Sequence, residues 1–430
     1  MDFPMEDIRI CVVGLGYVGL PLARLFSTKY KTIGFDKNSA RVESLMRGHD
    51  ATLEVSDDLL QSALKSGFEC TSDLERIKGC NFYVVAVPTP VDNDNVPDLT
   101  PLYGASEMVG KVISKGDIVV YESTVYPGVT EDECIPVIER VSGLKFNVDF
   151  YAGYSPERIN PGDKEHTVEK IIKVTSGSTP EVADIVDRVY NAVLVNGTHK
   201  ASSIRVAEAS KIIENAQRDV NIAFMNELAK IFNAMDIDTN DVIEAASTKW
   251  NFIKMRPGLV GGHCISVDPY YLIQKAEVYG VLPRVMISAR RLNDAMGAYV
   301  AEQTIKCMNK KGLVVKNAKI LVLGFTFKEN CPDIRNTKVA DIYHTLNEYT
   351  QNIEIYDPMP DGQKVKDEYG ITLSTRPLSA MKGEFDAVIL AVAHSQFKDL
   401  DVRSFLSQPQ KGVVYDVKGF LPREVVDGRL

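Results

Sequence analysis

The stretch that decides the fold is IRICVVGLGYVGLPLARLFSTKYKTIGFD, residues 8–36. Its first part, residues 8–13, is an apolar, β-branched run typical of a buried strand. The glycine-rich turn Gly14-x-Gly16-x-x-Gly19 follows at once, then a helical segment, then a second strand at residues 31–36. This order predicts a βαβ unit with two parallel strands.

The glycine turn and the acidic residue after the second strand indicate a dinucleotide-binding site. In such turns the first glycine permits the tight bend, the second lets a pyrophosphate approach the backbone, and the third allows close helix packing. Asp36 ends the second strand, where a carboxylate accepts hydrogen bonds from a ribose diol and repels a 2′-phosphate. We therefore expect NAD rather than NADP. The alternative is a purely structural turn, with Asp36 only ending a strand.

Short apolar runs separated by helical segments recur in two blocks of the chain. They lie at residues 82–87, 117–121 and 150–154, and again at 319–325, 353–357, 387–392 and 413–417. This pattern is typical of doubly wound parallel sheets. We expect an α/β protein with two Rossmann-like domains, at 1–198 and 306–430, joined by a long central helix in a region at 199–305.

The composition is that of an ordinary globular protein. Its 430 residues are 45% hydrophobic and 25% charged, and 49 basic against 58 acidic side chains give a net charge of −9. This negative field disfavours nucleic acids and anionic membranes as partners. No apolar stretch reaches the ~18 residues of a membrane span and the N-terminus is acidic, so we expect a cytoplasmic protein. Seven cysteines without metal-ligand spacing predict reduced thiols and no metal.

Residues 203–235 predict one long helix. Neither glycine nor proline occurs between residues 198 and 255, and apolar residues recur at helical spacing. These apolar positions are Ile212, Ala216, Val220, Ala223 and Ile231. A helix of this length spans ~45 Å at 1.5 Å per residue. Because that is longer than one small domain, we expect part of it to pack on the second subunit of a homodimer.

The same helix carries a polar stripe. Glu208, Lys211, Asn215 and Arg218 are three or four residues apart and therefore share one face. Lysine and asparagine side chains on one face could donate to a developing oxyanion. The alternative is a solvated face, since charged residues usually point to water.

Residues 258–269 read GLVGGHCISVDP and combine three glycines with a cysteine. The glycines would let the backbone approach a ligand, and basic side chains nearby could favour a thiolate at Cys264. A buried, unreactive cysteine is the plainer interpretation. Asp268 and Pro269 also match an N-cap followed by the first residue of a helix at 269–279.

Taken in this order, the motifs resemble the UDP-glucose/GDP-mannose 6-dehydrogenase family. They are Gly14-x-Gly16-x-x-Gly19-Leu-Pro, Val87-Pro-Thr89-Pro, Glu122-Ser-Thr124-Val, Ser155-Pro-Glu157-Arg158, Lys211 with Asn215, Gly261-Gly-His-Cys264-x-x-x-Asp268, Gly324-Phe-Thr-Phe-Lys328 and Asp333-Ile-Arg335. The resemblance extends over nearly the whole chain. It implies an NAD-binding domain at 1–198, a central dimerisation region with the catalytic cysteine at 199–305, and a UDP-sugar-binding domain at 306–430.

The resemblance implies a four-electron oxidation, in which the C6 alcohol of a sugar becomes a carboxylate and two NAD+ are reduced. By motif, Cys264 forms a thiohemiacetal with the C6 aldehyde and then a thioester. Asp268 with Lys211 and a water would manage the proton of the first oxidation, while Lys211 with Asn215 would stabilise the oxyanion. The positions matched to holding water and hydrolysing the thioester are Thr124 and Glu157.

The resemblance also implies two sets of binding residues. The expected cofactor contacts are Gly14, Gly16, Tyr17, Val18, Gly19, Asp36, Arg41, Thr89, Thr124 and Arg335. The expected substrate contacts are Glu157, Arg158, Lys211, Asn215, Arg218, Lys254, Gly261, Lys328 and Lys418. The expected partners are a UDP-sugar and a second copy of the chain, with no nucleic acid and no membrane.

Two stretches bear on the sugar. Residues 155–166 and Tyr415-Asp-Val-Lys418 are most similar to family members acting on UDP-N-acetylhexosamines, whereas UDP-glucose members carry an apolar residue at position 158 and arginine at position 418. We expect oxidation of UDP-GalNAc or UDP-GlcNAc for polysaccharide precursor synthesis, with the C4 epimer left open. The alternatives are a UDP-glucose or GDP-mannose 6-dehydrogenase, and a non-catalytic NAD(H)-binding sensor that has no use for Cys264.

Overall fold

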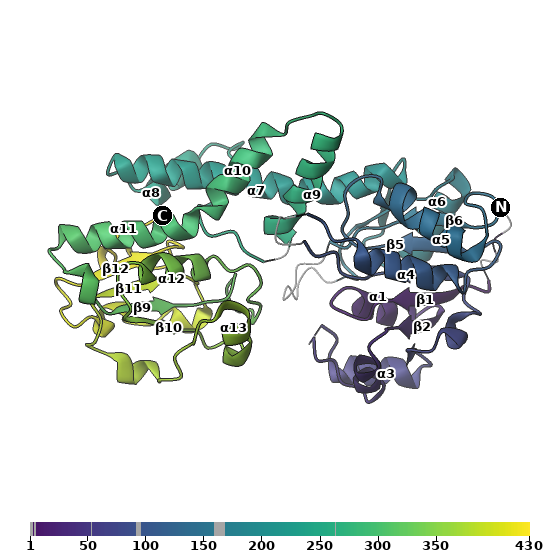
Figure 1. Ribbon diagram of the computed structural model, residues 1–430, viewed down its shortest axis with the longest axis horizontal. Helices are drawn as coiled ribbons and strands as arrows, with labels where there is room; N and C mark the ends of the chain where they lie inside the picture. Colours follow the sequence, from purple (N-terminus) through teal and green to yellow (C-terminus); the bar gives the residue numbers. More distant parts are fainter. Residues whose placement is uncertain (1–2, 4–5, 53, 92–95, 159–167, 263) are drawn as a thin grey trace. The chain divides into compact units, whose positions relative to one another are not determined.

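The computed structural model describes residues 3, 6–52, 54–91, 96–158, 168–262 and 264–430 (Figure 1). The chain divides into two compact units. The first unit comprises Met1–Glu214 and Tyr270–Val281, and the second comprises Asn215–Pro269 and Leu282–Leu430. Two helices cross from one unit to the other, so each unit contains part of both.

The first unit is built on a six-stranded parallel sheet in the order β3-β2-β1-β4-β5-β6. Its strands are β1 (Arg9–Val13), β2 (Lys31–Phe35), β3 (Glu69–Thr71), β4 (Phe82–Val85), β5 (Ile118–Tyr121) and β6 (Tyr151–Tyr154). The predicted βαβ unit is present, with β1 paired in parallel to β2. In this Rossmann order the connections change direction between β1 and β4, and ligands bind at the carboxyl ends of strands at such a point.

Helices cover both faces of this sheet. They are α1 (Gly19–Phe26), α2 (Ser39–Met46), α3 (Asp57–Lys65), α4 (Thr100–Gly110), α5 (Ile135–Ser142) and α6 (Pro180–Asn191), with a π-helix, η2 (Val129–Cys134), before α5 and a strand pair, β7 (Lys173–Thr175) and β8 (Thr198–Lys200). Alternate residues of β1 face opposite layers: Ile10 and Val12 pack with α1 and α6, whereas Cys11 and Val13 pack with α4 and α5. Burial on both faces explains the continuous apolar runs in the sequence.

The second unit holds a five-stranded parallel sheet in the order β10-β9-β11-β12-β13. Its strands are β9 (Ile320–Leu323), β10 (Ile353–Tyr356), β11 (Ala387–Leu390), β12 (Val413–Asp416) and β13 (Gly428–Arg429). One face packs against α11 (Met296–Lys310), α12 (Val339–Asn347) and α13 (Gly362–Tyr369), and the other against short helical turns that contain Phe397 and Phe405. The short helical turns of the chain are η1 (Leu74–Ile77), η3 (Val315–Asn317), η4 (Leu378–Met381), η5 (Ser395–Phe397), η6 (Val402–Phe405) and η7 (Arg423–Val425).

The remaining helices are α7 (Ile204–Ala234), α8 (Thr239–Ala246), α9 (Cys264–Val278) and α10 (Arg284–Asp294). The long helix predicted at 203–235 is confirmed as α7, with 31 residues. The start predicted for the helix at 269–279 is wrong. This helix is α9, which begins at Cys264, so Asp268 is not its N-cap and Pro269 lies inside it. A proline this close to the amino end removes only the bond to the carbonyl of residue 265, because the first four N–H groups of a helix have no partner in the helix.

The fold expected from the sequence, two Rossmann-like parallel sheets joined by a long central helix, is confirmed. None of the helices in the described part of the chain is long and apolar enough to cross a membrane. Six cysteines have described side chains and all carry free thiols, as expected: Cys11, Cys70, Cys80, Cys134, Cys307 and Cys331.

Candidate active site

The glycine turn after β1 has one glycine that protein packing does not explain. Gly14 has φ +91°, and a Cβ there would lie 2.8 Å from the Ala86 carbonyl oxygen. A Cβ on Gly19 would lie 1.7 Å from the Gly14 carbonyl oxygen, so both positions require glycine for the turn itself. A Cβ on Gly16 would meet nothing within 4 Å. The bare backbone at Gly16 fits the close approach of a pyrophosphate and argues against a purely structural turn.

Helix α1 opens directly from this turn. Its N-cap residue is Val18, which makes no side-chain capping bond, but the Leu20 N–H donates to the Gly16 carbonyl at 3.3 Å and Pro21 has no N–H. The helix dipole therefore adds to the attraction of an anion by the remaining N–H groups of the turn. Tyr17 is half exposed beside them. The expected cofactor residues of this turn therefore lie together at the carboxyl end of β1.

Asp36 and Arg41 brace the turn from the next strand and helix. The Asp36 carboxylate accepts the N–H groups of Leu15 and Asn38, both at 2.9 Å. Arg41 donates to the Leu15 carbonyl at 2.9 and 3.0 Å and to Asp50 at 2.6 Å. One guanidinium nitrogen of Arg41, Nη1, is buried and has no hydrogen-bond partner among the described residues. A spare cationic donor beside the turn suits an anionic dinucleotide.

The loops after β4 and β5 carry the two threonines expected near the cofactor. The Thr89 hydroxyl donates to the Thr124 carbonyl at 2.7 Å, so the structure brings the two residues together. The Tyr271 hydroxyl of α9 donates to the Thr89 carbonyl. These loops lie at the carboxyl ends of neighbouring strands, the edge where such sheets bind ligands.

A buried ion cluster lies just after the carboxyl ends of β5 and β6. Lys173, which is fully buried, donates to Glu122 at 2.6 Å, to the Pro156 carbonyl at 3.2 Å and to Glu157 at 3.4 Å. The Tyr190 hydroxyl donates to the other Glu122 oxygen at 2.5 Å. Glu157 was expected from its motif, but Lys173 was not, because one lysine at the start of a strand gives no sequence signal.

Burial dominates the electrostatics of this cluster. It raises the pKa of Glu122 to about 7; the neighbouring Glu157 charge acts in the same direction, against the lowering effect of Lys173 and the Tyr190 hydroxyl. Burial alone would lower the pKa of Lys173, but the two carboxylates outweigh it and raise that pKa. The cluster is therefore a place where a proton is bound and released near neutral pH.

Arg158, expected to contact substrate, is engaged within the first unit. It donates to the Glu214 carboxylate and, at 2.8 Å, to the Ile172 carbonyl. The rest of the sugar-related motif, residues 159–166, lies outside the described residues, as does His263.

The polar stripe of α7 is largely buried. Glu208, Lys211 and Asn215 are 0%, 7% and 4% exposed, whereas Arg218 is exposed. The solvated-face alternative is therefore wrong for three of the four residues. Among the described residues, none forms a hydrogen bond or ion pair with the Lys211 ammonium. The Lys211 side chain is therefore a donor on a mostly buried helix face with no protein acceptor among the described residues, which suits an anionic or oxygen-rich ligand group.

Asn215 connects the stripe to α9. Its amide donates to the Asp268 carboxylate at 2.5 Å and its carbonyl oxygen accepts from Arg218 at 3.1 Å. Asp268 is 1% exposed, and Cys264 opens the same helix one turn before it. The contact therefore places Asn215 and Asp268 side by side in the second unit.

Glu208, one turn before Lys211, fixes the loop that follows β5. Its carboxylate accepts the N–H groups of Gly128 at 2.5 Å and Thr130 at 2.9 Å. Burial raises the pKa of Glu208 to about 7, although these two hydrogen bonds oppose the change.

A glycine turn also follows the first strand of the second sheet, but there protein groups occupy the position that a ribose would take. Gly324 bonds to Tyr356 as Gly14 does to Phe35, in both cases at 2.8 Å. Asp357 takes the place of Asp36, but its carboxylate is buried and already bound by the Phe325 N–H at 2.6 Å and by His394 at 3.0 Å. No diol could displace these partners without leaving buried polar groups unpaired. The second sheet therefore keeps the Rossmann form without its ribose site.

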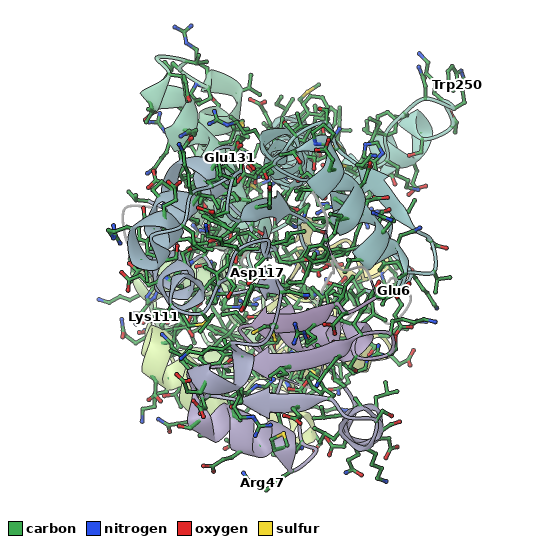
Figure 2. The ribbon with its side chains drawn as sticks, turned by 90° about the vertical axis from the view of Figure 1, so that its right-hand side faces the viewer. Glu6, Arg47, Lys111, Asp117, Glu131 and Trp250 are labelled. Atoms are coloured by element: carbon green, nitrogen blue, oxygen red, sulfur yellow. The ribbon has the colours of Figure 1, made fainter. Side chains whose placement is uncertain are left out.

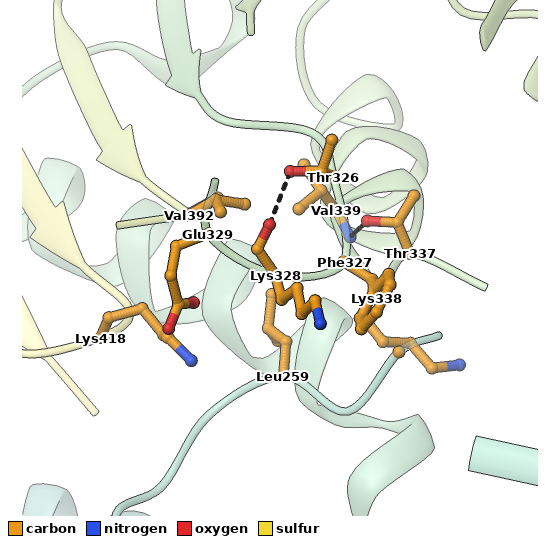
Figure 3. Close-up of a pocket in the computed structure, with 12 residues that line it drawn as sticks. Leu259, Thr326, Phe327, Lys328, Glu329, Thr337, Lys338, Val339, Val392 and Lys418 are labelled. Atoms are coloured by element: carbon orange, nitrogen blue, oxygen red, sulfur yellow. Dashed lines mark hydrogen bonds between the residues drawn. The ribbon is translucent and has the colours of Figure 1, made fainter. Parts of the chain in front are cut away.

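A small lysine-lined cavity lies beside this closed turn (Figure 3). Lys328 and Lys418, both expected to bind substrate, line it together with Gly261 and Lys338. Lys338 is paired with carboxylates of its own unit. Glu329 also lines the cavity, so its three lysines against one acidic side chain leave a net positive lining of the kind that binds phosphate groups.

The glycines of residues 258–262 serve packing as well as access. A Cβ on Gly261 would lie 2.8 Å from the Asn336 carbonyl oxygen, and one on Gly262, at φ +79°, would lie 2.7 Å from the Phe327 ring. The expectation that these glycines only admit a ligand is therefore incomplete. The buried Asn226 amide, which the sequence did not single out, holds the loop start through the N–H and C=O of Gly258 at 2.8 and 3.0 Å.

Two expected binding residues have protein partners in the second unit. Lys254 pairs with Glu244 at 3.1 Å, and Arg335 makes a two-pronged pair with Asp333 at 2.5–3.1 Å. Both are on the surface, where such pairs are weak and exchange readily for another anion.

One Rossmann sheet with an open dinucleotide turn, and a second whose turn is closed beside a lysine-lined cavity, define a two-domain, dinucleotide-dependent oxidoreductase. Family models cover most of the chain: the NAD binding domain of the UDP-glucose/GDP-mannose dehydrogenase family matches residues 8–194, its central domain 205–295 and its UDP binding domain 321–423. The chain belongs to this family. It is an NAD-dependent nucleotide-sugar dehydrogenase.

Individual relatives match over the full length. A UDP-N-acetyl-D-glucosamine 6-dehydrogenase of Pseudomonas aeruginosa is 55% identical over 427 residues, 99% of this chain and 100% of the relative. An enzyme of the same name from Salmonella typhi is 53% identical, covering 100% of both chains. Among solved structures, the UDP-D-ManNAc dehydrogenase of Pyrococcus horikoshii superposes with a TM-score of 0.87 at 28% identity, covering 98% of both chains.

Proposed function

We propose that this enzyme oxidises the C6 hydroxyl of UDP-N-acetylglucosamine to a carboxylate, with reduction of two NAD+. Two full-length relatives above 50% identity carry that activity in their names, whereas the UDP-N-acetyl-D-mannosamine dehydrogenase of Pyrococcus horikoshii is 31% identical. The proposal narrows the N-acetylhexosamine expected from the sequence to the gluco epimer. We also retain the role in polysaccharide precursor synthesis and the cytoplasmic location as predictions.

The observation that carries the proposal is the Asn215–Asp268 hydrogen bond one turn from Lys211, which is 7% exposed and has no hydrogen-bond or ion-pair partner among the described residues. An ammonium and an amide on one helix face would stabilise the oxygen of C6 as it develops negative charge. Asp268, already bound to Asn215, would accept the proton of the C6 hydroxyl through a water.

The later steps need a nucleophile and a base. Cys264 would attack the C6 aldehyde and hold the sugar as a thiohemiacetal and then as a thioester. Its place as the first residue of α9 suits a thiolate, because the amino end of a helix favours negative charge. Glu157 would activate the water that cleaves the thioester, with Thr124 holding that water.

The residues of the first turn fit NAD. Gly16 and the uncapped start of α1 would receive the pyrophosphate, Asp36 the ribose diol and Arg41 a phosphate oxygen. When bound, NAD+ supplies the hydride acceptor. We further propose that Arg335 exchanges its Asp333 partner for a cofactor phosphate.

The lysine-lined cavity would hold the nucleotide end of the substrate. Lys328 and Lys418 would bind the diphosphate, with Gly261 forming part of the wall. Lys254 would join them from its pair with Glu244. Arg158 and Arg218 would contact the sugar, Arg158 after release from Glu214.

We also propose a homodimer formed along α7. Val206, Ile213, Phe224 and Ile231 are 46–57% exposed and, at spacings of seven, eleven and seven residues, share the face opposite the buried polar stripe. Ile231, one of the apolar positions that predicted the helix, belongs to this stripe. Trp250, 92% exposed, also projects to solvent (Figure 2). A second copy is the occupant that suits an apolar face along so much of one helix.

The test is the number of NADH formed per sugar nucleotide consumed. Purified protein is assayed in parallel with UDP-GlcNAc, UDP-GalNAc, UDP-glucose and GDP-mannose. We expect two NADH per UDP-GlcNAc, with kcat/KM at least tenfold higher than for the other three. A preference for UDP-glucose or GDP-mannose would overturn the substrate, and one NADH would overturn the thioester route.

The Cys264→Ser variant separates an enzyme from an NAD(H) sensor. We expect this variant to bind NADH with unchanged affinity but to lose turnover at least 1000-fold, because a hydroxyl is a poor nucleophile without a base. Absence of turnover with every sugar in the wild type would favour the sensor.

A further inference from the structure

Lys173 is a wholly buried charged residue, and a contribution to the stability of the fold does not by itself explain its presence. With Glu122 and Glu157 it forms the cluster described above, in which Lys173 and Glu122 are both fully buried. Replacing such buried pairs with apolar residues is often neutral or stabilising, because desolvation offsets the attraction. The desolvation free energy that the cluster costs therefore points to a chemical role, exerted on the residues next to it.

The geometry directs Lys173 at Glu157. Its three N–H groups are used by Glu122, the Pro156 carbonyl and Glu157, so the ammonium cannot rotate without breaking a bond. The second Glu157 oxygen accepts the N–H of Arg158 at 2.6 Å. Both oxygens of the Glu157 carboxylate therefore accept hydrogen bonds, just after the end of β6.

The remaining groups of the cluster act on Glu122. Tyr190 donates to it from α6, and Lys173 binds its second oxygen. Among the described residues, the titratable groups that act on Glu122 and Lys173 are these two residues themselves, Glu157 and Tyr190. Two carboxylates share one ammonium, so the cluster takes up a proton on Glu122 more readily than an exposed glutamate would.

We propose that Lys173, backed by Glu122, is a positioning residue for the hydrolytic step, holding the Glu157 carboxylate in the orientation of a base. This inference rests on the proposed function, which assigns thioester hydrolysis to Glu157. It adds to that function the residues that prepare the base.

The step balances without any redox partner. The oxygen of a water forms a bond to the thioester carbon while one of its protons passes to Glu157. The carbon–sulfur bond then breaks, the sulfur of Cys264 leaves as a thiolate and the product leaves as a carboxylic acid, which loses its proton to solvent. Glu157 returns its proton to the thiolate or to solvent.

The experiment follows the covalent intermediate in the full-length enzyme. Wild type and the Lys173→Met, Glu157→Gln and Arg24→Met variants are mixed with UDP-GlcNAc and NAD+, and intact mass and NADH are recorded over time. Arg24→Met is the matched control, because it removes the ion pair with Glu169 in the same unit. NADH affinity and thermal unfolding are measured for each protein.

We expect Lys173→Met to produce an NADH burst close to two per site and then to accumulate the thioester, with steady turnover reduced at least 100-fold. Glu157→Gln should behave in the same way and Arg24→Met like wild type. An adduct with Glu157→Gln but wild-type turnover with Lys173→Met overturns the positioning role. Loss of the burst as well means a structural role only and also overturns it.

The two proposals fail in different ways. If Glu157→Gln forms no adduct while wild type yields two NADH, the role of Glu157 is wrong, and the inference about Lys173 falls with it. If Lys173→Met does not fold, Glu122→Gln decides. Because burial raises the pKa of Glu122 to about 7, we expect the wild-type hydrolysis rate to change near pH 7 and this change to flatten in Glu122→Gln; an unchanged pH profile overturns the proposal.

Discussion

Gly16 and Gly19 belong to one turn but have different neighbours. A Cβ at Gly16 meets no protein atom within 4 Å, whereas at Gly19 it meets the Gly14 carbonyl oxygen at 1.7 Å. We expect Gly16→Ala to change the free energy of unfolding by less than about 0.5 kcal/mol but to weaken NADH binding at least tenfold. Gly19→Ala should destabilise the fold by more than about 4 kcal/mol.

Calorimetric titration with NADH and thermal unfolding measure both effects. The two variants control each other, since they add the same methyl group three residues apart. Unchanged NADH affinity in Gly16→Ala would contradict the dinucleotide assignment of the turn.

Glu208 couples the stability of the first unit to pH. Its pKa is raised from 4.5 to about 7 by burial, so between these pH values the folded chain binds more protons at this site than the unfolded chain. The contribution of Glu208 to the free energy of unfolding therefore falls as pH rises through this window, by up to about 1.4 kcal/mol per pH unit. Glutamine does not titrate, so Glu208→Gln should gain stability relative to wild type from pH 5 to pH 7.

Urea unfolding at the two pH values measures this difference. Glu227→Gln, an exposed position of the same helix, is the control and should show no relative gain. A difference between wild type and Glu208→Gln that stays constant with pH would refute the linkage.

At the scale of elements, α7 organises its surroundings through buried polar side chains. Asn226 makes two bonds to the backbone of Gly258, which is itself buried, and a third to Asn293. Asn226→Ala leaves the Gly258 N–H and C=O unpaired, and each costs about 1–3 kcal/mol. We expect a loss of about 3 kcal/mol in urea unfolding.

Asn233→Ala is the matched control on the same helix. Asn233 is only half-buried and makes one bond, to the Tyr299 hydroxyl at 3.2 Å, so its loss should cost about 1 kcal/mol. Equal effects of the two substitutions would mean that Asn226 does not support the loop before Cys264.

At the scale of the whole molecule, the proposed homodimer depends on the exposed apolar stripe of α7. Burying a charged side chain without a partner costs free energy. The double variant Ile213→Glu/Phe224→Glu should therefore weaken association of the dimer at least 100-fold. Analytical ultracentrifugation over a concentration series measures the mass. The control places glutamate at Val148 and Val195, which are 62% and 74% exposed and are not residues of α7. A monomeric wild type, or a doubly substituted dimer of unchanged affinity, would rule out this interface.

The sequence by itself determined the two sheets, the βαβ unit at 8–36 and the long helix, because hydrophobic period and glycine turns are local signals. Motif order also led to the family. The local sequence misplaced the start of α9, because Asp268-Pro269 has the form of a helix cap. Only the packed chain shows that the helix begins at Cys264.

Only the tertiary structure decided which polar side chains are buried and which residues they pair with. Whether the stripe of Lys211 and Asn215 faces water or the interior depends on what packs against α7, and the pairing of Lys173 with Glu122 joins residues 51 positions apart. The closing of the second glycine turn by His394 likewise requires strands distant in sequence to lie side by side. Such contacts leave no local pattern, because the energy that selects them arises only when remote charged and polar groups lose water together.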